Sequence, residues 1–295
     1  MFSWALAALV VSFPSQAVSI RIVSNSRPRT RISTLTGRPQ KAFHSRTHIW
    51  AMAALQEDTR SHNVPFRALF VGNSLTYFCG GVGEHVRALW SAHHPEMEME
   101  VTSFTKGGAP LSKLWKGAKK VLRDASTSGS PFDVVVLQED LPETTPASFA
   151  DALERFVPEV RTHGAQPVLY MAWAYDRLRS VVDDDDIERI HAELATTHTL
   201  DVAAVGVARR LCEARLHASA RLSHVDLWDD DREHPSPAGT YLAACVIYGA
   251  IFQCSPVGIS YFPNGMCEEV ARELQSSAAL VLPPATTSWF FSQAS

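Results

Sequence analysis

From about residue 66 onward, short apolar runs alternate with longer amphipathic segments. The runs are short enough, and apolar enough, to be strands buried on both faces. They lie at 68–71, 99–104, 134–138, 167–170 and 202–205, with helical patterns between them, for example at 149–160 and 187–198. This alternation predicts an α/β fold, a three-layer α/β/α sandwich built around a five-stranded parallel sheet.

The first apolar run ends in Gly72-Asn73-Ser74, and a helix-like segment continues from there to Trp90. Glycine and asparagine favour a turn that would place Ser74 beyond the carboxyl end of the strand, at a helix N-terminus. There its own N–H and the helix dipole favour negative charge on a bound carbonyl oxygen. A serine at such a turn is equally typical of an ordinary N-cap, so both interpretations stay open at this point.

A second segment places Asp231 three residues before His234, just ahead of a long apolar run. Ser236 followed by Pro237 is typical of an N-cap and a first-turn proline, so His234 is expected on the loop before a buried helix. The spacing lets one tight turn bring the carboxylate to one imidazole nitrogen. The other nitrogen is then free to act as base for a serine hydroxyl. With Ser74, these residues supply the parts of a Ser-His-Asp triad.

These blocks resemble the SGNH, or GDSL-type, hydrolases, in the branch whose first block reads Gly-Asn-Ser-Leu-Thr. The similar pattern covers about residues 66–280. The resemblance implies that Ser74 is the nucleophile, that His234 is the base and that Asp231 orients it, with no metal or organic cofactor. It also implies that a glycine of Lys106-Gly107-Gly108 donates its N–H to the oxyanion hole, and Gly108 is the better match.

The third block departs from the family pattern. In the family a strand ends in Gly-x-Asn-Asp, and the asparagine amide is the third oxyanion donor. Here the strand at 134–138 ends in Gln138-Glu139-Asp140, with no asparagine nearby. Gln138 carries the same amide one methylene further out. We therefore expect an oxyanion hole formed by the N–H groups of Ser74 and Gly108 and by the Gln138 amide.

The implied activity is that of a serine esterase or acyl hydrolase acting on an O-acyl ester of a carbohydrate, a lipid or a small molecule. An acyltransferase would use the same triad, with a sugar, lipid or pigment hydroxyl in place of water. A non-catalytic carbohydrate- or lipid-binding module could also keep this fold. Retention of all three triad positions favours an enzyme, because a binding module has no physical need for them.

Cysteine content and the apolar run at 241–252 change this interpretation little. The five cysteines show no zinc-type spacing, so neither a metal site nor disulfides are expected. Cys79 lies close to Ser74 in the sequence, but a buried structural cysteine is more common than a nucleophile. The twelve-residue run is shorter than the roughly 20 residues that span a bilayer, so a buried helix is expected.

Residues 1–56 differ from the rest of the chain. Residues 4–13 are nearly all apolar and are followed by small residues, whereas 18–56 contain seven basic and no acidic residues. We expect a targeting leader at 1–56 and the catalytic domain at 57–295. A bipartite leader favours a plastid, and a secretory signal or a mitochondrial leader are the alternatives. Without the leader the domain is strongly acidic, which argues against nucleic-acid binding.

Overall fold

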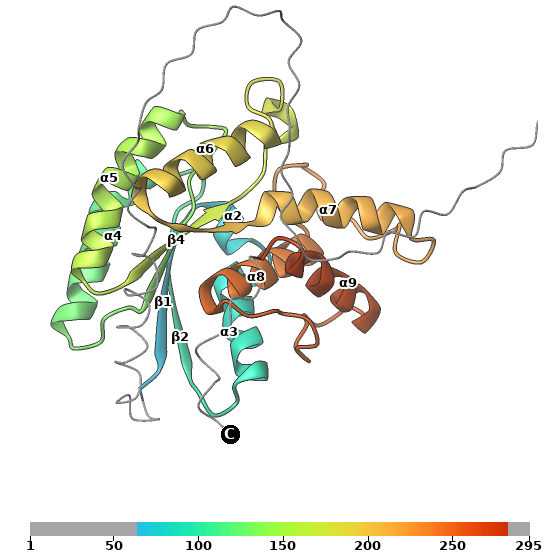
Figure 1. Cartoon of the computed structure of the whole chain (residues 1–295), viewed down its shortest axis with the longest axis horizontal. Coiled ribbons are helices and arrows are strands. Elements are labelled where there is room, and N and C mark those ends of the chain that lie inside the picture. The colour runs from blue at the N-terminus through green and yellow to red at the C-terminus, as the bar shows by residue number, and fades with distance from the viewer. Residues whose placement is uncertain (1–63, 283–295) are drawn as a thin grey trace, which may run out of the picture. The chain divides into compact units, whose positions relative to one another are not determined.

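The predicted parallel sheet is present in the computed structural model, which describes residues 64–282 (Figure 1). Its strands are β1 (Phe66–Gly72), β2 (Met99–Thr105), β3 (Val134–Leu137), β4 (Gln166–Met171) and β5 (Asp201–Ala204). All neighbouring pairs are parallel, in the order β2-β1-β3-β4-β5. The α/β prediction is therefore confirmed, and the strands lie within two residues of their expected bounds. The predicted leader at 1–56 falls outside the described residues.

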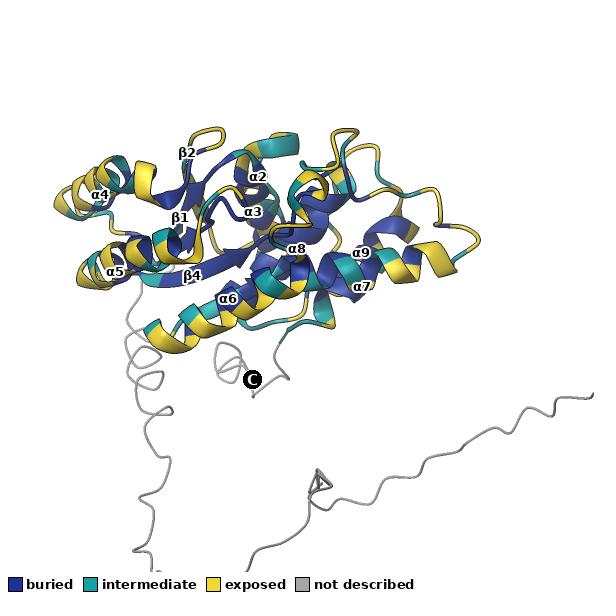
Figure 2. Cartoon of the chain, turned by 90° about the horizontal axis from the view of Figure 1, so that it is seen from above, coloured by how far each residue is buried: buried dark blue, intermediate teal, exposed yellow. Residues whose placement is uncertain are grey.

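Alternating side chains along the strands divide the core into two layers. On β1, Ala68 and Phe70 belong to one buried cluster, and Leu69 and Val71 belong to the other. This is the period of two that a strand buried on both faces produces. The first cluster is covered by α3 (Val82–His93), α7 (Val205–Ala218), α8 (Pro237–Phe252) and α9 (Glu268–Ala279); the second is covered by α4 (Leu111–Thr127), α5 (Pro146–Thr162) and α6 (Asp184–His198). Figure 2 shows most of β1 and β4 in dark blue and the outward helix faces in yellow.

Helix α8 is the buried helix predicted from the run at 241–252. Ser236 caps it by accepting a hydrogen bond from the N–H of Gly239, and every residue from Gly239 to its end at Phe252 is buried. It lies against α3, α7 and α9 and so forms the centre of its layer. Among the helices of residues 64–282, none has the length and apolar character needed to cross a membrane.

The helix expected from Ser74 to Trp90 is interrupted, so that prediction is wrong. Helix α2 (Ser74–Tyr77) ends after one turn and is followed by the short 3-10 helix η1 (Phe78–Gly80) before α3 begins. Cys79 has φ 47°, and Gly80 and Gly81 both have φ 88°. This left-handed backbone favours glycine and cannot continue a right-handed helix. The break turns η1 toward the loop that carries His234, as described below.

Candidate active site

Ser74 is the first residue of α2, directly after the end of β1, as predicted. The preceding Asn73 caps this helix, and its side-chain oxygen accepts a hydrogen bond from the N–H of Leu75 at 3.0 Å. Any side chain at Gly72 would lie 2.3 Å from the hydroxyl oxygen of Thr76, so only glycine fits there. Because α2 is a single turn, few peptide dipoles add along it. The Ser74 N–H, rather than a long helix dipole, is therefore the useful group at this point.

Gln138 is fully buried at the end of β3, beside this turn. Its side-chain oxygen accepts hydrogen bonds from the main-chain N–H of Asn73, at 2.8 Å, and from the Thr76 hydroxyl, at 3.0 Å. Its side-chain nitrogen donates to the main-chain oxygen of Glu139 at 2.6 Å. The Gln138 carboxamide thus braces the turn that presents Ser74. Its expected role as an oxyanion donor stays a prediction.

Two buried carboxyl groups follow Gln138 and extend this network. Asp140 accepts hydrogen bonds from the side-chain amide of Asn73 and from the Tyr175 hydroxyl, and burial raises its pKa. Glu139 accepts from the main-chain N–H of Asp140 and from the Thr144 hydroxyl through one oxygen, and its second oxygen is buried. Burial raises the pKa of Glu139 to about 7. Sequence reasoning missed this network, although acidic residues after a buried strand were a signal for it.

Asp231 and His234 are paired on a loop before α8, as predicted. One oxygen of the Asp231 carboxylate lies 2.6 Å from Nδ1 of His234. Nε2 is therefore the ring nitrogen that could act as a base. The other carboxylate oxygen of Asp231 accepts from the main-chain N–H groups of Glu233 and His234, each at 2.9 Å. Burial opposes ionisation of Asp231, but these hydrogen bonds outweigh it and lower its pKa to about 2. Asp231 is therefore fixed as a carboxylate that holds the imidazole.

The segment after Ser74 packs directly on the loop of His234. The Phe78 ring stacks on the His234 ring, with centroids 4.4 Å apart and planes 20° apart. The Cys79 thiol donates to the main-chain oxygen of Pro235 at 3.5 Å, and burial raises the pKa of this thiol. The side chains of Ser74 and His234 share no hydrogen bond in the described structure, a contact that often tightens only with substrate bound. Phe78 was not predicted, and its signal is its position one helical turn after Ser74.

Gly108 lies on the turn between β2 and α4, beside the end of β1. The N–H of Lys106 donates to the Gly72 carbonyl at 3.2 Å, and the Lys106 carbonyl closes the turn by accepting from the N–H of Ala109. Gly108 has φ 57°, in the left-handed region that favours glycine. The half-exposed Tyr77 reaches this loop, because a side chain built at Gly107 would lie 3.0 Å from its hydroxyl. Tyr77 is thus an unpredicted candidate substrate contact.

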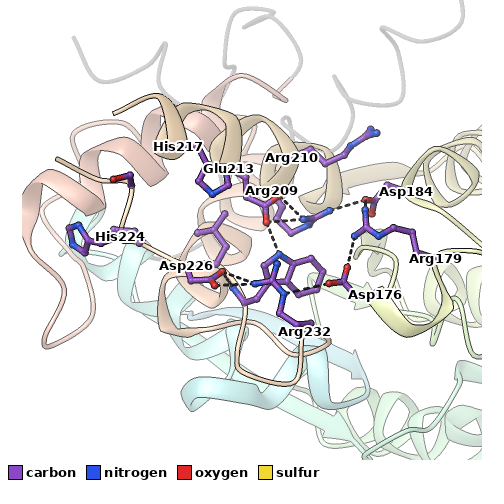
Figure 3. A pocket seen from close by; sticks show the side chains of 14 residues that line it. Asp176, Arg179, Asp184, Arg209, Arg210, Glu213, His217, His224, Asp226 and Arg232 are labelled. Atoms are coloured by element: carbon purple, nitrogen blue, oxygen red, sulfur yellow. Dashed lines mark hydrogen bonds and ion pairs between the residues drawn. The ribbon is translucent and has the colours of Figure 1, made fainter. Parts of the chain in front are cut away.

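The loop that carries Asp231 and His234, here called the catalytic loop, is also contacted by a network of charged groups (Figure 3). The guanidinium groups of Arg209 and Arg232 lie 4.6 Å and 5.2 Å from the ring of Trp228, which begins the loop. Arg209 also pairs with Asp184 at 2.9 Å, and Arg232 pairs with Asp226 at 3.0 Å. These groups line a pocket of about 510 Å³, and Ser74, Asp231 and His234 are not among the residues that line it. Its position suits support of the loop rather than chemistry.

The geometry defines an α/β protein with a serine directly after β1 and an Asp-His pair on the loop before α8. Comparisons with known proteins show which solved structures share this fold. No family model and no curated protein matches the sequence. One similar solved structure is a protein from Slackia heliotrinireducens that has been proposed to be an SGNH hydrolase. It is 28% identical, and the match covers 63% of this chain and 99% of that protein with a TM-score of 0.50.

A second similar structure is a DUF4886 family protein from Bacteroides uniformis ATCC 8492. It is 16% identical, and the match covers 72% of this chain and 93% of that protein with a TM-score of 0.56. At this identity the similarity concerns the fold alone. The described residues have the SGNH hydrolase fold, and the resemblance predicted from the motifs is confirmed.

Proposed function

We propose that this protein is a serine esterase that hydrolyses O-acyl esters through an acyl-enzyme. The observation that carries the proposal is the Asp231–His234 pair at 2.6 Å, on a loop that stacks against the segment directly following Ser74. This pairing fixes a carboxylate on one imidazole nitrogen and leaves the other for the serine hydroxyl. The similarity to a proposed SGNH hydrolase at 28% identity supports the same activity.

In the first half of the reaction, the Ser74 oxygen attacks the acyl carbon while His234 Nε2 takes the hydroxyl proton. The carbonyl electrons move onto oxygen and then return as the bond to the alcohol breaks. The leaving alcohol takes the proton from His234. In the second half, water attacks the acyl-enzyme, gives its proton to His234, and releases the acid as Ser74 recovers its proton. Asp231 stays ionised throughout, because its pKa is about 2.

The oxyanion formed in each half would lie against the N–H groups of Ser74 and Gly108. The exposed, left-handed turn at Gly108 leaves open space where a side chain would stand, so a substrate oxygen can approach the backbone. The Gln138 amide is proposed as the third donor. For that role its nitrogen must reach the oxyanion in addition to, or instead of, the Glu139 carbonyl that it now contacts.

The test is labelling of the full-length chain with a fluorophosphonate, followed by peptide mapping. We expect the label on Ser74 of the wild-type protein. The Ser74→Ala variant should lose both the label and the hydrolysis of short-chain aryl esters. Cys79→Ala is the matched control, because Cys79 lies nearby and is the alternative nucleophile. It should keep both labelling and turnover. Unchanged turnover in Ser74→Ala would refute the proposal, and labelling without turnover would favour an acyltransferase.

The proposal names the substrate only by class, as an O-acyl ester of a glycan, a lipid or a small molecule. Membership of the Gly-Asn-Ser-Leu-Thr branch rests on the residues around Ser74.

We also propose import into a plastid, which rests on the composition of residues 1–56. A fluorescent fusion of residues 1–60 should leave the cytosol, and a cytosolic fusion would refute the leader.

A further inference from the structure

The lysines of this chain are gathered beside the candidate oxyanion loop. The chain has six lysines, and five of them fall between residues 106 and 120. Lys106 begins the glycine turn, and the others lie on α4, the helix that follows it: Lys113, Lys116, Lys119 and Lys120. All five are exposed. An otherwise acidic domain thus carries its lysines on one flank of the site.

Three of these lysines lack the carboxylate partners that most of the other described cations have. Within residues 64–282, every arginine except Arg155 and Arg161 lies within 4.0 Å of a carboxylate. Lys119 pairs with Glu159 at 3.0 Å, and Lys120 pairs with Asp124. Lys106, Lys113 and Lys116 have no such pair among the described residues. We call these three residues the lysine strip.

The lysine strip begins at the candidate catalytic centre. The main-chain N–H of Lys106 is hydrogen-bonded to Gly72, two residues before Ser74. Helical geometry then places Lys113 and Lys116 on neighbouring positions of one helix face. That face is opposite the buried side of α4, which carries Leu111, Leu114, Ala118 and Leu122. Positive charge therefore runs outward from the oxyanion turn along α4.

On the other side of β1, beyond β3, the charged groups near the site are paired with one another. Glu143 and Glu233 lie there with Arg177 paired to both, and Asp231 is close by on the catalytic loop. A substrate with an anionic group would therefore be attracted to the lysine strip, whose positive charge has no carboxylate pair among the described residues, rather than to that side. The charge distribution thus orients a negatively charged substrate, whereas it gives a neutral one no orientation.

We propose that the esterified substrate is an acidic polysaccharide, whose chain follows the lysine strip while its O-acyl group enters the site at Ser74. This inference rests on the proposed esterase function. The strip is convex, exposed and extended, which suits repeated carboxylate or sulfate groups on a chain more than a single small anion. None of the exposed large hydrophobic side chains of residues 64–282 lies on α4, whereas a membrane-binding helix presents apolar residues.

The test compares two double variants of the full-length protein, each of which removes two exposed positive charges. Lys113→Gln/Lys116→Gln changes the lysine strip, and Arg189→Gln/Arg272→Gln changes two exposed, ion-paired arginines on α6 and α9 as the matched control. The substrates are O-acetylated polygalacturonate and O-acetylated dextran, which is neutral. Wild type should prefer the acidic polymer at low salt, and the preference should fade as salt screens the exposed charges.

The strip variant should lower that preference, the ratio of the two kcat/KM values, about tenfold, which is the lower end of what electrostatic steering supplies. The control variant should keep it. Equal preference in both variants, or a preference that salt does not change, would overturn the inference.

A binding assay separates this inference from the proposed function. Ser74→Ala should be retained on immobilised polygalacturonate at low salt, and the strip substitutions added to it should abolish retention. Failure of wild type to hydrolyse any ester would refute the esterase proposal. The binding assay would then still test, independently of catalysis, whether the lysine strip binds an acidic polysaccharide. Tighter binding to anionic lipid vesicles or to duplex DNA than to polygalacturonate would overturn the polysaccharide assignment.

Discussion

The two halves of the candidate active site are held in place by different physics. The turn around Ser74 is buried and is fixed by the neutral amide of Gln138 and by Asp140, which contacts the cap residue Asn73. The loop of His234 is largely exposed, and besides its own hydrogen bonds it is held by ion pairs and by the stacking of Arg232 on Trp228. Short hydrogen bonds in a water-excluded site are strong and insensitive to salt. Exposed ion pairs are weak and are screened by salt.

This difference suits the two tasks. The nucleophile must present one hydroxyl and nearby N–H groups in a fixed geometry, so a buried and fully bonded turn is useful. The base must gain and lose a proton in each half-reaction, so a partly solvated loop with one fixed carboxylate partner is useful. Substitutions in the buried half should therefore affect stability and rate together, and those in the exposed half should affect rate more than stability.

The sharpest test of the exposed half is Asp231→Asn. We expect kcat to fall about 10⁴-fold, because an asparagine no longer fixes the imidazole tautomer or stabilises its charged form. The lowered pKa of Asp231, about 2, means that its carboxylate also stabilises the fold, but solvent screens a side chain that is 47% exposed, so the melting temperature should fall only modestly. Steady-state kinetics and thermal unfolding measure the two effects. A loss of less than tenfold would mean that Asp231 does not orient the base.

The corresponding test of the buried half is Gln138→Ala. It leaves the main-chain N–H of Asn73 without its acceptor, and a buried unsatisfied donor costs about 1–3 kcal/mol. We expect this loss in the free energy of unfolding, measured with denaturant, and a fall in kcat of about 10²- to 10³-fold with little change in KM. An unchanged kcat would show that Gln138 has no catalytic contribution.

Glu139→Gln tests the buried network through pH. Burial raises the pKa of this carboxyl from 4.5 to about 7, so between these values the folded protein keeps a proton that the unfolded chain releases. The free energy of unfolding should therefore fall as pH rises through this window, by up to about 3 kcal/mol. The glutamine variant has no carboxyl group to titrate there. Its melting temperature should therefore rise relative to that of wild type as the pH increases from 5 to 7.

The exposed carboxylate of Glu154 on α5 provides the control, because Glu154→Gln removes an acidic group that is 69% exposed. Its melting temperature should follow that of wild type across the same pH range. Parallel pH profiles for wild type and Glu139→Gln would show that Glu139 titrates normally.

Much of this arrangement was predictable from the sequence, because its signals are local. The alternation of apolar runs predicted the sheet, and the spacing of Asp231 and His234 predicted their pairing. The orientation of the Gln138 amide was not predictable, since it depends on a main-chain N–H 65 residues away. The break at Cys79 was missed because the apolar pattern continues across it, although Gly80-Gly81 signals a turn. The pKa of Glu139 depends on burial by the whole fold.

The smallest expected effect concerns Arg232, which anchors the exposed half. Arg232 has φ 56° and is held by Asp226 at 3.0 Å, by Asp176 at 3.4 Å and by the ring of Trp228. Exposed ion pairs and cation–π contacts each contribute up to about 1 kcal/mol, so Arg232→Gln should lower kcat/KM about three- to tenfold. Arg232→Lys, which keeps the charge, should restore part of the loss.

Salt distinguishes anchoring by Arg232 from a general loss of stability. Raising the ionic strength screens the ion pairs of wild type, so its kcat/KM should approach that of Arg232→Gln, whereas the effect of Gln138→Ala should stay constant. Arg215→Gln is the control, because Arg215 forms an exposed ion pair with Glu273 away from the catalytic loop. If Arg215→Gln loses as much activity as Arg232→Gln, the charged network does not position His234, and the contrast between the two halves of the site fails.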